Sequence, residues 1–175
     1  QEVVLDWLLE QDGKSLLFSP LGSYVEKNHD AIRSMIEHPA SAVGLSDGGA
    51  HCGLICDASF PTYLLTHWTR DRTRGDKLPL ELVVNKQTKA TADVYGLGDR
   101  GVLQVGKRAD VNVIDLDALH LHVPHMIFDL PAGGRRLVQP VDGYRWTVQA
   151  GEITFVDGEA TGARPGRVVR GRRNG

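Results

Sequence analysis

The first half of the chain alternates apolar stripes at helical spacing with short, continuous apolar runs. The stripes, together with the residues that can cap them, predict amphipathic helices at residues 2–11, 28–37, 59–72, 80–86 and 90–95. The runs are closed by turn-forming residues and predict buried strands at residues 15–18 and 42–45. Helices and strands in alternation are typical of parallel α/β sheets and barrels.

The pattern changes after Gly96. Four β-rich stretches follow, at residues 102–105, 111–114, 146–149 and 153–156. Ala150-Gly151 and Asp157-Gly158 stand where tight hairpin turns are expected. We therefore predict two parts, a mixed α/β part at residues 1–95 and an all-β part at residues 96–175. The arginine-rich end of the second part, from residue 164 onward, is predicted to be solvated.

Composition and charge narrow the class of protein. The 175 residues are 41% hydrophobic and 24% charged, which predicts a packed globular core. The net charge of −2 gives no reason to expect a nucleic acid or an anionic membrane as the main partner. No apolar run approaches the roughly 18–20 residues that span a bilayer, and no signal peptide is evident, so we expect a cytoplasmic protein. Cys52 and Cys56 are then expected to be reduced thiols.

The sharpest local feature is the loop Ser46-Asp47-Gly48-Gly49-Ala50-His51. It follows a predicted buried strand, so Asp47 stands at the carboxyl end of that strand, where α/β barrels carry their active sites. A carboxylate there can bind a metal ion, take a proton from water and return it to a leaving group. The glycines let a substrate approach the backbone. The local pattern alone leaves a second interpretation open, in which Asp47 caps the turn that follows.

Histidines are the other candidates for chemistry. His51 could contact a substrate carboxylate or steady the loop, but one His and one Asp do not make a metal site. His120, His122 and His125 form an H-x-H-x₂-H cluster, which we interpret as loop or edge residues, with metal binding as the less favoured alternative. Serine-hydrolase, P-loop and Rossmann motifs are absent from the sequence.

Several stretches resemble the amidohydrolase superfamily, and within it the branch of the N-acyl-D-amino-acid deacylases (D-aminoacylases). They are residues 35–39, 44–51, 59–65, 80–84 with Thr88, 98–115, 148–151, 157–162 and 164–167. The most specific is Gly98 to Asp115, which is similar to the segment where such enzymes leave their barrel and enter a small β-sandwich. The resemblance covers nearly the whole chain.

The resemblance implies the C-terminal part of a (β/α)₈ TIM barrel followed by part of a β-sandwich. It implies an enzyme that hydrolyses an amide, with an N-acyl-D-amino acid as substrate and Zn²⁺ or another divalent ion as cofactor. In such enzymes the metal would polarise the amide carbonyl and supply a hydroxide. Asp47 matches the aspartate of the last barrel strand, which binds the metal, deprotonates the water and protonates the leaving nitrogen. We expect Ser46, Gly48 and His51 to contact the substrate.

The other metal ligands of the family have no counterparts in the sequence. We therefore expect the missing N-terminal half of the barrel as a partner, and expect this chain by itself to be inactive and without metal. Bare sheet edges predict self-association into a homo-oligomer. Asp110 looks structural, an acid that enters a strand and is held by backbone amides.

Two other functions stay open. The first is a cyclic amidohydrolase, similar to a dihydroorotase or hydantoinase, which the ligands in the missing half would distinguish. The second is a non-catalytic scaffold, if 175 residues are the mature chain. Metal analysis separates an enzyme from a scaffold.

Overall fold

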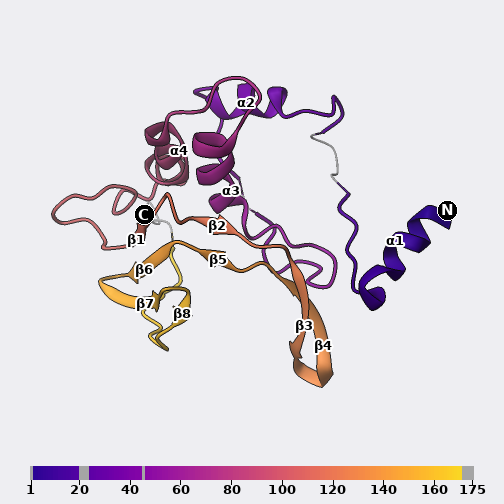
Figure 1. Ribbon diagram of the computed structural model, residues 1–175. Helices are drawn as coiled ribbons and strands as arrows, with labels where there is room; N and C mark the ends of the chain where they lie inside the picture. The colour runs from indigo at the N-terminus through magenta and orange to yellow at the C-terminus, as the bar shows by residue number, and fades with distance from the viewer. Residues whose placement is uncertain (1, 20–23, 45, 171–175) are drawn as a thin grey trace. The chain divides into compact units, whose positions relative to one another are not determined.

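The computed structural model describes residues 2–19, 24–44 and 46–170. The chain divides into two compact units, residues 1–41 and 42–175. Within the described residues, the α-helices all lie before residue 95 and the strands all lie after residue 110 (Figure 1). This change of character agrees with the one predicted near Gly96, while the domain boundary at 95/96 itself stays a prediction.

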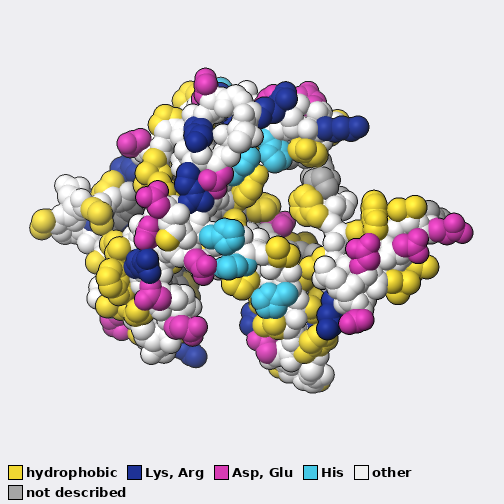
Figure 2. All heavy atoms as spheres, viewed as in Figure 1, with side chains coloured by type: hydrophobic (Ala, Val, Ile, Leu, Met, Phe, Trp, Pro, Cys, Tyr) yellow, Lys and Arg dark blue, Asp and Glu magenta, His cyan; other side chains and the backbone are white. Residues whose placement is uncertain are grey.

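The first unit holds two helices, α1 (Glu2–Gly13) and α2 (Asp30–Glu37), close to where the apolar stripes predicted them. The backbone of α1 leaves helical geometry at Glu10, and its hydrophobic side chains are open on the molecular surface (Figure 2). His38 after α2 is extended (φ −63°, ψ 129°) because a proline follows it. The strand predicted at residues 15–18 is absent.

The first helices of the second unit follow a long loop and form a layer. Its helices are α3 (Phe60–Thr66), continued by the π-helical turn η1 (His67–Asp71), then α4 (Leu80–Gln87) and α5 (Lys89–Val94). All three helical segments agree with the predicted ones. The buried hydrophobic residues of the described chain gather here and are Leu65, Trp68, Leu78, Val83, Ala92 and Leu119. The core of the second unit therefore lies among α3, α4 and α5, with Leu119 added from the β-rich part.

A four-stranded antiparallel sheet follows, in the order β1-β6-β7-β8. Its strands are β1 (Val111–Ile114), β6 (Tyr144–Gln149), β7 (Glu152–Val156) and β8 (Glu159–Ala160). The turns at Ala150-Gly151 and Asp157-Gly158 have positive φ at both central residues, as type I′ hairpins require. These turns and three of the four predicted strands are confirmed. The fourth, at residues 102–105, is wrong, because this segment is a loop.

Two further antiparallel pairs complete the β-rich part. β2 (His120–Leu121) pairs with β5 (Val141–Asp142), and β3 (His125–Leu130) pairs with β4 (Gly134–Val138). The sequence pattern did not predict the longer β3–β4 hairpin, which Figure 1 shows as a two-stranded ribbon. Its turn, Pro131–Gly134, carries the local signal that was available, a proline and two glycines between apolar runs.

The barrel strand predicted at residues 42–45 is not formed over 42–44, and Leu45 lies outside the described residues. A strand persists only where a neighbour takes its backbone hydrogen bonds, and the described part of the chain offers none to this segment or to residues 15–18. The observed fold is helices followed by antiparallel sheets. Residues 164–170 form neither helix nor strand, and the rest of the predicted solvated tail lies outside the described residues.

Two sets of contacts hold the β-rich part together and join it to the helices. Arg70 in η1 donates to the carbonyl oxygens of Leu116 and Leu119, the latter at 2.9 Å. Asp110 accepts a hydrogen bond of 2.8 Å from the backbone N–H of Ala150 and is paired with Arg108 at 2.9 Å. The structural role predicted for Asp110 is therefore confirmed.

Candidate functional site

Asp47 lies in a tight turn at the start of a long loop that ends at α3. Its φ is 49°, a left-handed conformation that Asp tolerates better than most residues, and its backbone carbonyl accepts a hydrogen bond of 3.2 Å from Ala50. The residue is exposed. Within the described chain its carboxylate makes no hydrogen bond or ion pair. The interpretation of Asp47 as a turn cap therefore gains no support from these contacts.

The other residues expected at the site lie in the same turn. His51 is exposed, with φ 44°, and its carbonyl accepts hydrogen bonds from Leu54 (2.7 Å) and Ile55 (3.0 Å). A side chain added at Gly48 would stand 3.3 Å from Cβ of Ala58, so this glycine allows the two ends of the loop to approach. Ser46 is half-buried. The side chains of Asp47 and His51 are therefore accessible to solvent, while hydrogen bonds between backbone groups of the turn hold its shape.

Both cysteines belong to this loop and are free thiols, as the sequence predicted. The Sγ of Cys52 lies 3.4 Å from the carbonyl oxygen of Gly49. Burial, and secondarily the charge of Asp57, raise the pKa of the Cys56 thiol. This thiol therefore stays protonated at neutral pH and is poorly suited to act as a nucleophile or as a thiolate ligand.

The β3–β4 hairpin and Gln139, the residue that follows it, contact the loop at three points. The backbone N–H of Leu137 donates to the carbonyl oxygen of Cys52 at 2.7 Å. The hydroxyl of Ser59 donates to Oε1 of Gln139 at 2.6 Å. The side chain of Arg135 lies against Gly53, where an added Cβ would stand 3.3 Å from Nε of the arginine. Ser59 was predicted to cap α3, but its side chain makes no capping hydrogen bond and bonds to Gln139 instead.

The described residues do not complete a metal site. Nowhere in residues 2–19, 24–44 and 46–170 do three His, Cys, Asp or Glu side chains gather so that they could hold a metal ion. A catalytic zinc takes about three protein ligands and a water, and the Asp47 loop offers a single candidate carboxylate. His122 Nε2 pairs with Asp142 Oδ2 at 2.7 Å, and the ring of His120 stands edge-on to that of His122. These two histidines are therefore engaged at the edge of a short sheet, as the sequence analysis favoured.

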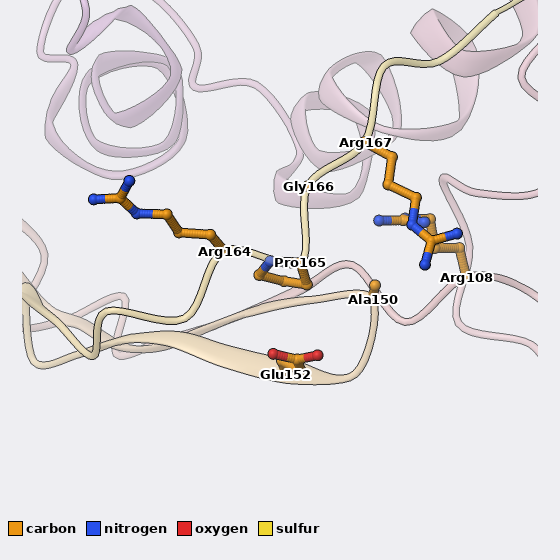
Figure 3. A pocket seen from close by; sticks show the side chains of 7 residues that line it. All are labelled: Arg108, Ala150, Glu152, Arg164, Pro165, Gly166 and Arg167. Carbon is orange, nitrogen blue, oxygen red and sulfur yellow. The ribbon is translucent and has the colours of Figure 1, made fainter.

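A surface cavity of about 440 Å³ lies elsewhere in the second unit (Figure 3). It is lined by Arg108, Ala150, Glu152, Arg164, Pro165, Gly166 and Arg167. Asp110 neutralises Arg108, Glu152 adds a negative charge to the wall, and Figure 3 shows Arg164 pointing away from the other arginines. None of its lining residues comes from the Asp47 loop, so this cavity is no part of the candidate site.

Within the residues that the structure describes, no helix has both the length and the apolar character needed to cross a bilayer.

Comparison with known proteins places these features in a family context. The sequence model of the amidohydrolase family matches residues 13–155. The chain is similar to the N-acyl-D-glutamate deacylase of Alcaligenes xylosoxydans xylosoxydans, with 34% identity over 122 residues. This match covers 67% of the chain but 24% of the deacylase, so the aligned segment spans about a quarter of that relative. No solved structure matches the chain significantly.

Proposed function

The chain belongs to the amidohydrolase family, in its D-aminoacylase branch, and we propose that it is the C-terminal portion of an enzyme that hydrolyses N-acyl-D-amino acids. The observation that supports the proposal best is the exposed carboxylate of Asp47, which has no partner in the described chain and lies in one of the stretches that resemble the family. An acid–base catalyst must come within hydrogen-bonding reach of its substrate, and the exposed carboxylate of Asp47 meets that condition.

In this proposal Asp47 moves one proton twice. It takes a proton from the attacking water as the water oxygen bonds to the carbonyl carbon of the amide. It then gives that proton to the amide nitrogen, and the carbon–nitrogen bond breaks. The acyl group leaves as a carboxylic acid and the D-amino acid as a free amine, so Asp47 ends in the state in which it began. Proton transfer by a positioned side chain contributes about 10²–10⁴-fold to a rate.

Substrate contacts in this proposal come from the same turn. His51 would donate a hydrogen bond to the carboxylate of the substrate, and Ser46 and Gly48 would contribute a hydroxyl and a backbone N–H. The similar deacylase is named for N-acyl-D-glutamate, so an acidic D-amino acid is the first substrate to test.

We also propose that the whole protein uses Zn²⁺ or another divalent ion. The residues described here do not fit such a site by themselves, because Asp47 is a single candidate ligand and no cluster surrounds it. In the proposal, the remaining ligands and the rest of the barrel lie in the N-terminal half, and this half is the natural partner of the exposed apolar residues of α1. Without it, the chain is expected to form homo-oligomers.

The direct test of substrate class is a hydrolysis assay of the whole protein. We expect release of free D-glutamate from N-acetyl-D-glutamate, with much less release from the L enantiomer. Ring opening of a hydantoin or of dihydroorotate, with no deacylation, would support the cyclic amidohydrolase instead. No turnover of either class by metal-loaded protein would favour the scaffold.

A further inference from the structure

The outer edge of strand β4 lies along the loop that carries Asp47. In an antiparallel pair, alternate residues turn their backbone N–H groups away from the partner strand. Leu137 of β4 is opposite Met126 of β3, and its N–H points away from β3 and donates to the carbonyl oxygen of Cys52 at 2.7 Å. The hairpin therefore uses an edge group, which would otherwise be bare, to hold the loop five residues beyond Asp47.

A second contact holds the far end of the same loop. The carboxamide of Gln139 is engaged at both of its ends, since Oε1 accepts from Ser59 Oγ at 2.6 Å and Nε2 donates to the carbonyl oxygen of His122 at 2.9 Å. Because both ends are bonded, the amide cannot rotate freely without losing a hydrogen bond. Ser59 is the residue before α3, so this bond fixes the point where the loop enters the helix.

Arg135, Leu137 and Gln139 are two residues apart, so their contacts with the loop recur at the spacing of an extended strand. The absence of a side chain at Gly53 lets the side chain of Arg135 lie against the loop. The hairpin itself is stiffened by a two-point ion pair, in which Arg136 donates to both carboxylate oxygens of Asp129 at 2.7 and 2.6 Å.

The hydrogen bonds within the loop are local. The backbone bonds link Ala50 to Asp47, and Leu54 and Ile55 to His51. Such bonds set the shape of a turn but do not fix where it sits on the rest of the protein. Two longer-range bonds do fix it, one donated by Leu137 to Cys52 and one that Gln139 accepts from Ser59.

We propose that Gln139, with the β4 edge, is a positioning residue that holds the Asp47 loop in register for proton transfer. The inference rests on the proposed role of Asp47. We call the hydrogen bonds of Gln139 and Leu137 to the loop the brace. A misplacement of about 1 Å at a catalytic group costs on the order of 10²-fold in rate, so loss of the brace should affect turnover more than substrate affinity.

The test compares three variants of the whole enzyme, Gln139→Ala, Ser59→Ala and the double variant, with Gln104→Ala as the matched control. Gln104 is exposed, and its side chain makes no hydrogen bond in the described chain. We expect Gln139→Ala to lower kcat roughly 10- to 100-fold, with KM within about twofold. The double variant should be no slower than the slower single variant, because both changes remove the same interaction. Gln104→Ala should match wild type.

Hydrogen exchange provides a readout that does not depend on turnover. Amides of residues 47–55 should exchange faster in Gln139→Ala and Ser59→Ala, while those of α4 and β6 stay unchanged. If Gln139→Ala does not fold, Ser59→Ala carries the same comparison. Wild-type kcat and unchanged exchange in both single variants would overturn the inference, as would slowing explained entirely by a smaller folded fraction.

Asp47→Asn, measured alongside, separates the two proposals. If Asp47→Asn keeps wild-type kcat, the proposed role of Asp47 is wrong, and the proposed positioning role of Gln139, which depends on it, is wrong as well. If Asp47→Asn loses activity while the Gln139 and Ser59 variants keep it, the brace alone is wrong.

Discussion

Thr62 Oγ1 lies 2.9 Å from Tyr144 Oη, a hydrogen bond that joins α3 to β6 across 82 positions of the sequence. Thr62 is buried, with 5% of its surface exposed, so its hydroxyl has little access to water as an alternative partner. The helix at the end of the Asp47 loop is thereby attached to the four-stranded sheet as well as, through Ser59, to Gln139.

Removing both partners of this bond should cost less than the sum of the two single removals. Tyr144→Phe leaves the Thr62 hydroxyl unpaired, and we expect a loss of about 1–2 kcal/mol in the free energy of unfolding. Adding Thr62→Val replaces both polar groups and should bring the total below the sum of the two single changes. Urea denaturation of the four proteins measures this coupling. Strictly additive losses would show that the two hydroxyls do not interact.

The hairpin pair of Asp129 and Arg136 should be visible in a pH titration. The hydrogen bonds from Arg136 hold the pKa of the Asp129 carboxyl below its ordinary value of 3.8. A lowered pKa means that the pair stabilises the hairpin above pH 4, and that this contribution is lost as the pH falls through the lower, folded value. Carboxyl NMR should report a pKa under 3.8 in wild type and an upward shift in Arg136→Gln. Equal values in the two proteins would contradict the pairing.

Metal content provides a test that needs no substrate. Since the described residues gather no set of three ligands, we expect the 175-residue chain to bind clearly less than one zinc per chain after dialysis against micromolar zinc. The whole enzyme should retain at least one. Elemental analysis of both preparations decides the matter, and stoichiometric zinc that disappears from the isolated chain on Asp47→Asn would contradict our account of an incomplete site.

Sequence patterns predicted those elements whose causes are local. The helical stripe that includes Leu65 and Trp68 and the turn at Ala150-Gly151 depend on neighbouring residues, and both are present in the structure. The strands predicted at residues 15–18 and 102–105 failed because an apolar run becomes a strand only when another strand pairs with it. The β3–β4 hairpin was missed although Pro131–Gly134 marks its turn.

The same distinction applies to the candidate site. Asp47 and its glycines stand together in the sequence, so the loop could be singled out without a structure. Gln139 could not, because its partner Ser59 is 80 residues away and a lone glutamine has no motif. Ser59 was misassigned for a related reason, since a serine before a helix usually caps it.

The most direct test of the central claim is the kcat of the whole enzyme with Asp47→Asn, measured together with its thermal midpoint. Asn has nearly the same shape as Asp and caps turns and helices about as well, but it cannot take a proton from water. If Asp47 transfers the proton, kcat should fall about 10²–10⁴-fold while the thermal midpoint stays near that of wild type. An Asp47→Asn enzyme that keeps most of its kcat would contradict the account.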